Sequence, residues 1–249
     1  MRLKFSNAAV WKYVVSSIAK IIEEGVFKAD ASGLRMRALD SSNTALIDLV
    51  IPKESFAEYE VGGEERFGVN FEDFSKILKL ASKGDELVLE TFEGGRLGVT
   101  FHGHGTRTFI LPNIEVSTVE EISEIELEFP VTARIQPAIF ADVLKELEVI
   151  GDVVTLESEA GSSKLVLSSS SDVAEAKIEL SLEDGSLLEY TASADAKASY
   201  SIEYLVEISR ISPVAEGLTL SYGSNIPMRL VFDISQGGRL TFYVSPRVE

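Results

Sequence analysis

Four segments of the chain carry apolar side chains at helical spacing, and each leads through a glycine-containing turn into a run of strand-like residues. These segments are residues 10–22, 71–81, 139–149 and 202–211. The closing glycines, Gly25, Gly84, Gly151 and Gly217, lie roughly 60 to 67 residues apart. This regular spacing predicts one supersecondary unit repeated four times, in two pairs.

Between the predicted helices the sequence alternates apolar and polar residues. Examples are TALIDLVI at 44–51 and MRLVFDI at 228–234. Such strands are apolar on one face, and that face must be buried against the helices. The pattern therefore predicts an α+β fold with two similar domains, built from four helix-plus-antiparallel-sheet units.

An acidic stretch between the second and third units is predicted to be the interdomain linker. We place the first domain at 1–111, the linker at 112–127 and the second domain at 128–249. Within the linker, Val116, Val119, Ile122 and Ile125 recur at a spacing of three, which is also compatible with an amphipathic helix. Periodicity alone leaves the conformation of the linker open.

Composition narrows the class of protein. The 249 residues are 45% hydrophobic and 25% charged, which is typical of a folded chain. The absence of cysteine excludes disulfides, thiolate zinc sites and cysteine nucleophiles. No apolar run approaches the roughly 18 residues of a membrane span, and residues 1–25 do not resemble a signal peptide. We therefore expect a protein that is neither secreted nor bound to a membrane.

The net charge of −17 predicts that the molecule as a whole repels nucleic acid and anionic membranes. The exposed faces of the four predicted helices differ from this overall negative charge, because each face carries at least one cation. The cations are Lys12, Lys20, Lys76, Lys79, Lys145 and Arg210. On a single helix an exposed lysine is ordinary. Its recurrence on all four helices makes phosphate binding and simple solvation about equally good interpretations.

Several motifs resemble one known family. They are ALDSS from Ala38, GVNFEDFSKILKLASKGDELVL from Gly68, FADVLKELEVIGD from Phe140, Ile226-Pro227, and FYVSPRVE from Phe242. Together they are similar to the sliding DNA clamps of archaeal and eukaryotic replication, the proliferating cell nuclear antigen family, in its archaeal type. The similarity covers essentially all 249 positions. It implies a two-domain subunit, three of which join head to tail in a ring whose hole is lined by helices.

The resemblance also implies how the ring would work. Duplex DNA would be encircled without sequence preference, and its phosphates would meet Lys12, Lys76, Lys79, Lys145 and Arg210, to which helical geometry adds Lys20. Departures from the family pattern are Tyr13, Asp142 and Val149, where basic or histidine residues are frequent, together with Glu203 and Glu207 beside Arg210. Strands near 106–111 of one subunit and 172–180 of the next would join, in copies of this chain or in paralogous subunits.

A second implied surface binds partner peptides in an apolar pocket beneath the linker. The matching positions are Leu39, Thr44, Leu46, Val119, Pro227, Tyr243, Ser245 and Pro246. The expected partners are the replicative DNA polymerase, the clamp loader, the flap endonuclease and DNA ligase. The resemblance places such a protein in the cytoplasm, associated with the nucleoid of a prokaryotic-type cell.

The sequence contains no recognisable catalytic motif, and we expect neither an enzyme nor a cofactor. His102 and His104 have metal-ligand spacing but no third ligand at a recognisable distance, so a polar hairpin tip is the favoured interpretation. Two alternatives stay open. A hydrolase with a carboxylate pair would be monomeric or dimeric and show turnover, whereas an accessory or checkpoint-type ring subunit would assemble without enhancing DNA synthesis.

Overall fold

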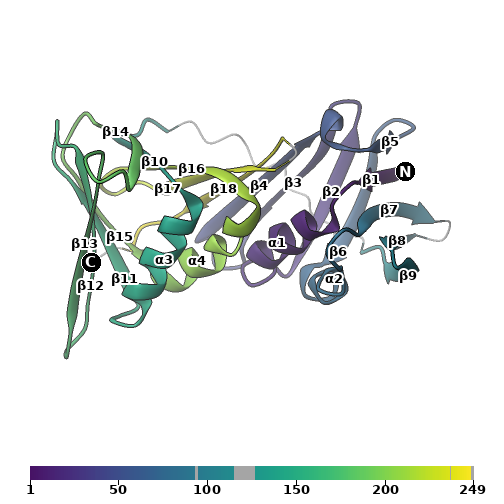
Figure 1. The fold of residues 1–249 in the computed structure, drawn as a ribbon, viewed down its shortest axis with the longest axis horizontal. Helices are drawn as coiled ribbons and strands as arrows, with labels where there is room; N and C mark the ends of the chain where they lie inside the picture. The colour runs from purple at the N-terminus through teal and green to yellow at the C-terminus, as the bar shows by residue number, and fades with distance from the viewer. Residues whose placement is uncertain (93–94, 115–126, 236, 248–249) are drawn as a thin grey trace. The chain divides into compact units, whose positions relative to one another are not determined.

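The computed structural model describes residues 1–92, 95–114, 127–235 and 237–247. The chain forms two compact units (Figure 1), one of Met1–Ser123 with Ile234–Leu240 and one of Glu124–Asp233 with Thr241–Glu249. Most of the predicted linker, residues 115–126, lies outside the described residues, so the domain limits at 111 and 128 stay predictions. No helix in the described ranges is long and apolar enough to span a membrane.

All four predicted helices are present. They are α1 (Ala8–Ile18), α2 (Phe71–Leu78), α3 (Pro137–Glu148) and α4 (Ile202–Ser209). The side chain of Asn7 accepts the amide of Ala9 at the start of α1, and Asn70 accepts the amide of Asp73 at the start of α2. Pro137 opens α3, where its missing N–H costs no hydrogen bond.

The first unit contains two groups of antiparallel strands beside α1 and α2 (Figure 1). One sheet has the order β5-β1-β7-β8-β9, and in the other group β4, β3, β2 and β6 follow one another. The strands are β1 (Arg2–Phe5), β2 (Glu24–Asp30), β3 (Gly33–Leu39), β4 (Ala45–Pro52), β5 (Glu58–Glu60), β6 (Glu65–Asn70), β7 (Glu86–Phe92), β8 (Arg96–Gly103) and β9 (Gly105–Pro112).

The second unit repeats this plan with α3 and α4. One sheet has the order β13-β12-β11-β15, and in the other β14, β10, β16, β17 and β18 follow one another. The strands are β10 (Val131–Ile135), β11 (Val153–Ser158), β12 (Lys164–Ser170), β13 (Glu175–Ser181), β14 (Leu187–Ala192), β15 (Ala196–Ser201), β16 (Ala215–Tyr222), β17 (Met228–Ile234) and β18 (Gly238–Val244). Because α3 contacts both β12 and β16, the helices cover both sheets of the unit.

Backbone hydrogen bonds brace the two helices of each unit against each other. In the first unit the carbonyl of Asp85, after α2, accepts the first amide of α1 at 2.9 Å, and the carbonyl of Glu23, after α1, accepts the first amide of α2 at 2.9 Å. In the second unit the carbonyl of Asp152, after α3, accepts the amide of Ile202 at 3.0 Å. These bonds satisfy amides that helix starts otherwise leave unpaired.

Candidate DNA-facing and partner-binding surfaces

Of the predicted cations of the first unit, Lys12 lies on α1 and Lys76 on α2, whereas Lys20 and Lys79 lie in the turns directly after these helices. Lys20 and Lys79 are exposed and Lys12 is half-buried. Lys76 is exposed but paired, with Nζ at 2.9 Å from Glu72 and 3.1 Å from Asp73. The hydrogen bond to Glu72, followed by that to Asp73, raises the pKa of Lys76 above its ordinary value. The ammonium group therefore stays charged but is shared with two carboxylates.

In the second unit both predicted cations are ion-paired. Nζ of Lys145 lies 3.1 Å from Asp142, one turn earlier on α3. Arg210, at the end of α4, donates from Nε and Nη2 to the two oxygens of Glu207, at 2.5 and 2.9 Å. This bidentate contact raises the pKa of Arg210, and the charge of Glu148 adds to the effect.

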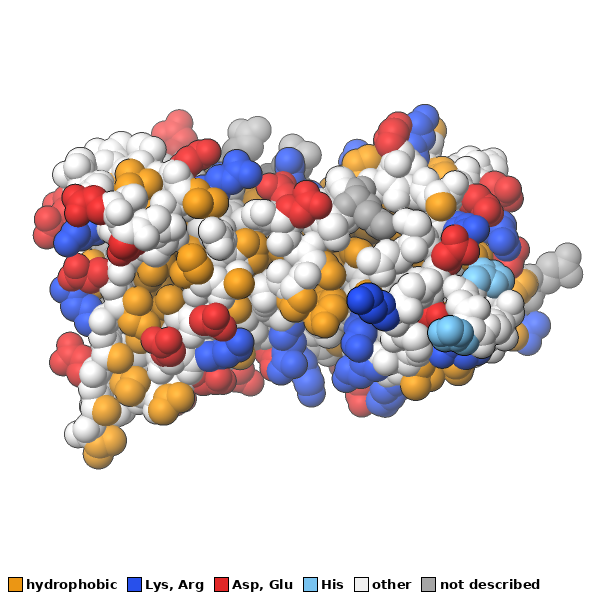
Figure 2. Space-filling model, viewed as in Figure 1, with side chains coloured by type: hydrophobic (Ala, Val, Ile, Leu, Met, Phe, Trp, Pro, Cys, Tyr) orange, Lys and Arg blue, Asp and Glu red, His pale blue; other side chains and the backbone are white. Residues whose placement is uncertain are grey.

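Figure 2 shows that the charged side chains are also distributed differently over the surfaces of the two units. Lys and Arg side chains gather in the part of the first unit where Figure 1 draws α1 and α2. Acidic and basic side chains are mixed where it draws α3. The two helix pairs thus present different charges, although their backbones are alike.

The strand predicted to join subunits in the first unit, β9, lies at the edge of its sheet. Arg107, Phe109 and Leu111 are half-buried and stand opposite the core residues Phe101, Val99 and Leu97 of β8, whereas Thr106, Thr108 and Ile110 are exposed. Arg107 also donates to the buried carboxylate of Asp85 and, at 3.1 Å, to the carbonyl of Leu80. The edge strand is therefore tied to the end of α2 and carries an apolar row along its inner face.

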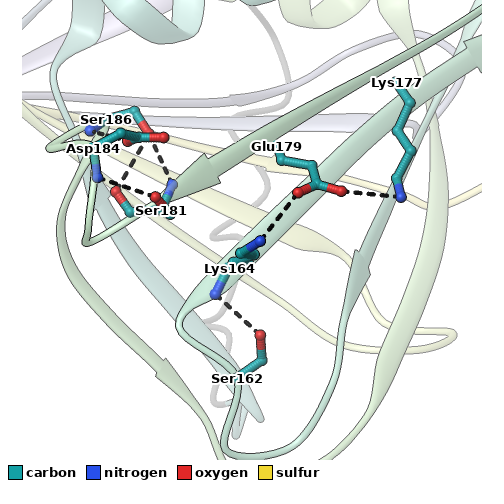
Figure 3. A network of polar contacts seen from close by, with 7 residues as sticks. All are labelled: Ser162, Lys164, Lys177, Glu179, Ser181, Asp184 and Ser186. Carbon is teal, nitrogen blue, oxygen red and sulfur yellow. Dashed lines mark hydrogen bonds and ion pairs between the residues drawn. The ribbon is translucent and has the colours of Figure 1, made fainter.

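The strand predicted to join subunits in the second unit, β13, is likewise at a sheet edge. Its inner row is Ala176, Ile178 and Leu180, and its outer row is Glu175, Lys177 and Glu179. Figure 3 shows Glu179 between Lys177, at 3.1 Å, and Lys164 of β12, at 3.4 Å. The bonds from Lys177 and then Lys164 lower the pKa of Glu179, so this carboxylate stays ionised between the two ammonium groups.

A serine-rich turn ends β13 (Figure 3). The amide of Ser181 donates to Oγ of Ser186 at 2.8 Å, and the amide and hydroxyl of Ser186 both donate to Asp184, at 2.8 and 2.5 Å. The two bonds from Ser186, the hydroxyl foremost and then the amide, lower the pKa of Asp184. The end of the edge strand is thereby fixed by hydrogen bonds within the turn.

Three of the predicted peptide-binding residues lie on the β3–β4 hairpin. Leu39 and Leu46 are paired in register, and Leu39 is exposed to 42% whereas Leu46 is buried. The carboxylate of Asp40 accepts the amides of Thr44 and Ala45, both at 2.7 Å. Asp40, the acidic residue of the ALDSS motif, therefore fixes the turn of the hairpin on which Leu39 is exposed.

Four of the remaining predicted residues lie in the second unit, and Val119 lies outside the described residues. Pro227, Tyr243, Ser245 and Pro246 are all half-buried. The segments that carry them are attached to β15, because Tyr200 donates to the carbonyl of Ile226 at 3.3 Å and the amide of Arg247 donates to the carbonyl of Ser199 at 2.7 Å. Within this unit, one strand positions both segments.

The two histidines lie at the β8–β9 hairpin, as predicted. Gly103 and Gly105 face each other across the turn, with His104 between them, and Nδ1 of His102 lies 3.2 Å from Oγ1 of Thr106. Among the residues that the structure describes, no group of three or more His, Asp or Glu side chains is arranged to hold a metal ion.

Comparison with known proteins covers the whole chain. Residues 1–104 match the N-terminal domain of proliferating cell nuclear antigen, and residues 121–247 match its C-terminal domain. A protein of Aeropyrum pernix named DNA polymerase sliding clamp 3 is 45% identical over 249 residues, which is 100% of this chain and 98% of the relative. The protein of the same name from Sulfurisphaera tokodaii is 38% identical over 250 residues and is covered completely, as is this chain.

Solved structures agree with the sequence matches. A chain in the crystal structure of the PCNA2–PCNA3 complex from Sulfolobus tokodaii superposes with a TM-score of 0.93 at 38% identity, with both chains covered to 100%. PCNA from Thermococcus kodakaraensis superposes with a TM-score of 0.92 at 28% identity, with both chains covered to 99%. The chain therefore belongs to the proliferating cell nuclear antigen family, whose archaeal relatives are named DNA polymerase sliding clamps.

Proposed function

We propose that this chain is one subunit of a trimeric ring that encircles duplex DNA and tethers DNA polymerase to it, which makes synthesis processive. The observation that carries the proposal is the full-length match to both domains of the clamp family, combined with two helix pairs of the same design. A closed ring cannot leave the duplex sideways, so retention needs no tight contact. Weak, sequence-independent attraction to phosphates is sufficient.

The proposed subunit contact pairs β9 of one chain with β13 of the next. Both are edge strands with unpaired backbone groups, and pairing would remove both edges. The inner rows support it, since Phe109 and Leu111 on β9 and Ile178 on β13 are apolar and only half-buried. The solved PCNA2–PCNA3 complex contains two different clamp proteins, which supports paralogous subunits as well as identical ones as ring partners.

The proposed partner surface binds short peptides from the replicative polymerase, the clamp loader, the flap endonuclease and DNA ligase. In the first unit exposed Leu39 is available for such an apolar anchor, and in the second unit half-buried Tyr243 and Pro246 are available. The chain would then act as a platform in replication and repair without catalytic residues or a cofactor. Its place would be the cytoplasm, at the nucleoid.

The function is tested by mass and by primer extension. Light scattering on the purified chain, alone and mixed with candidate paralogues, should give the mass of a trimer. Primer extension on a circular template, with polymerase and clamp loader, should yield longer products when the ring is present. A ring that assembles but leaves product length unchanged would instead indicate an accessory or checkpoint-type clamp, and a monomer with hydrolytic turnover would contradict the clamp proposal.

The partner surface is tested with a double variant, Leu39→Ala with Tyr243→Ala. Calorimetry with a peptide that carries one aliphatic and two aromatic anchors should show loss of binding, while the oligomer mass stays unchanged. Leu188→Ala is the matched control, because Leu188 is exposed to 49% and lies outside the proposed surface. Equal affinity for the double variant and the control would contradict this assignment.

A further inference from the structure

The two helix pairs differ in the balance of their exposed and half-buried charges. On α1, α2 and the turns after them the cations outnumber the carboxylates: Lys12, Lys20, Lys76, Lys79 and Lys83 against Glu23, Glu72 and Asp73. On α3, α4 and the turns after them the balance is reversed: Lys145 and Arg210 against Asp142, Glu146, Glu148, Asp152, Glu203 and Glu207. Charges on a surface act over a Debye length of about 8–10 Å at moderate salt, so this local balance, rather than the net charge of the chain, decides whether phosphate is attracted.

The first unit keeps ammonium groups that no carboxylate neutralises. Among the described residues, no Asp or Glu oxygen lies within 4.0 Å of Nζ of Lys12, Lys20, Lys79 or Lys83. Only Lys76 on these helices is paired, with Glu72 and Asp73. Lys83, in the turn after α2, was not among the cations predicted from the helical faces because it lies beyond the periodic segment. It is exposed and belongs to this basic surface.

On the helices of the second unit, all of which lie within the described residues, neither cation is free of a carboxylate. Asp142 holds Lys145, and Glu207 holds Arg210 through two hydrogen bonds. Glu148 of α3 adds a second negative charge near Arg210 of α4. A phosphate that approached Arg210 would have to displace the bidentate carboxylate of Glu207 and would also be repelled by the negative charge of Glu148.

We propose that the phosphodiester backbone of duplex DNA contacts this chain only through α1, α2 and the turns directly after them, at Lys12, Lys20, Lys79 and Lys83, and that the surface of α3 and α4 excludes phosphate. The inference rests on the proposed clamp function. In a ring, each chain would then offer one basic and one acidic helix pair to the duplex. The contacts would alternate around the hole, and Lys145 and Arg210 would serve the stability of their own helices.

The test compares matched double variants in the assembled ring. The probe is a fluorescent 30-base-pair duplex of arbitrary sequence, and its affinity for the ring is measured by anisotropy from 25 to 200 mM salt. Lys20→Ala with Lys79→Ala removes two cations from the first unit, and Lys145→Ala with Arg210→Ala removes two from the second. All four side chains are exposed, so each variant is expected to fold. Trimer mass is checked for every variant.

The first variant should lower the affinity at 25 mM salt about fivefold or more and flatten the salt dependence, by close to one unit of slope for each lysine that contacts a phosphate. The second variant should stay within about twofold of the unmodified ring. A third variant, Asp142→Asn with Glu207→Gln, releases Lys145 and Arg210 from their carboxylates. It should raise the affinity about threefold or more, because it removes two negative charges from this surface and leaves both cations free to meet phosphate.

Two outcomes overturn this inference but leave the clamp function intact, provided that the unmodified ring binds the duplex. One is an equal loss of affinity in the first and second variants, and the other is no gain of affinity in the third variant. Failure of the unmodified ring to bind or to promote primer extension overturns the clamp function and, with it, the inference. Loss of affinity in the first variant but not in the second, together with a gain of affinity in the third, supports the inference.

Discussion

In the first unit the buried ring of Phe27 contacts four other aromatic rings, whereas in the second unit the buried ring of Tyr222 is fixed through its hydroxyl. Phe27 stacks on Phe67 with ring centroids 4.9 Å apart and lies 5.9 to 6.5 Å from Trp11, Phe71 and Phe74. The hydroxyl of Tyr222 lies 2.7 Å from Oγ of Ser158, which also accepts the hydroxyl of Tyr190 at 2.6 Å. The first core therefore contains a cluster of packed aromatic rings, and the second contains a chain of three hydroxyls among its apolar side chains.

The Gly-Asp turn that the two units share shows the same divergence. Asp85 is buried, accepts the amide of Ser82 at 2.7 Å and pairs with Arg107. Asp152, at the matching place in the repeat, is exposed. Both nevertheless use their backbone carbonyl to brace a helix. The comparison teaches that the backbone plan is common to the repeat, while each unit has its own side-chain interactions, so side-chain substitutions should act on one unit at a time.

The largest expected effect is that of Phe27→Ala, which should destabilise the first unit by about 3–5 kcal/mol, because it removes a fully buried ring and leaves a cavity among four others. The single tryptophan, Trp11, belongs to that cluster and reports its unfolding by fluorescence in urea. Tyr13→Ala on α1 is the control, since Tyr13 is only half-buried. A shift of the same size in the control would show that the aromatic cluster does not dominate the stability of this unit.

Arg107→Ala should be the next largest, with a cost of about 2–3 kcal/mol, because it leaves the carboxylate of Asp85 buried with the amide of Ser82 as its remaining partner. The value is below that of a fully buried pair because the Arg107 side chain is 36% exposed. Asp152→Ala in the second unit should change the free energy of unfolding by less than about 0.5 kcal/mol. Similar losses in both variants would remove the distinction between the two turns.

Removal of the shared hydroxyl in the second unit, Ser158→Ala, should cost about 1–2 kcal/mol, since it leaves the phenol of Tyr222 buried without its partner. The double variant with Tyr222→Phe should lose less than the sum of the two single variants, because both act on one hydrogen-bonded chain. Circular dichroism in urea measures all three. Strict additivity would contradict the coupling.

The helices were predictable because their signals are local. Apolar spacing and the turn glycines lie within a few residues of each helix, and the predicted segments match α2, α3 and α4 to within a few residues. For α1 the prediction ran to residue 22, whereas the helix ends at Ile18 and a tighter turn follows, with the amide of Ile21 bonded to the carbonyl of Ile18. Apolar spacing does not distinguish such a turn from a further turn of helix.

The long-range contacts were not predictable from periodicity. The pairing of Lys145 with Asp142 follows from a spacing of three on one helix and could have been read from the sequence. The contact of Arg107 with Asp85 needs strand β9 beside the end of α2, and the contact of Tyr190 with Ser158 needs strands from two sheets. The edge positions of β9 and β13 likewise depend on the order of strands in each sheet, which alternation alone does not specify.

The smallest effect should appear at alkaline pH. Burial raises the pKa of Tyr200 and Tyr222 well above the ordinary value of 10.0, so both phenols stay neutral in the folded second unit while they ionise in the unfolded chain. Stability from this source is complete below pH 10 and falls as the pH rises further, by about 0.8 kcal/mol per tyrosine at pH 10.5. Urea unfolding at pH 9.0 and 10.5, followed by circular dichroism, should show this loss of stability, and Tyr200→Phe should reduce the loss by the contribution of one tyrosine.

The first unit offers a matched comparison, because burial raises the pKa of Tyr59 as well. Tyr59→Phe should reduce the alkaline loss of stability by a smaller amount than Tyr200→Phe, since the phenol of Tyr59 is only half-buried. An equal loss in the unmodified chain and in Tyr200→Phe would mean that the alkaline sensitivity comes from groups other than the buried tyrosines.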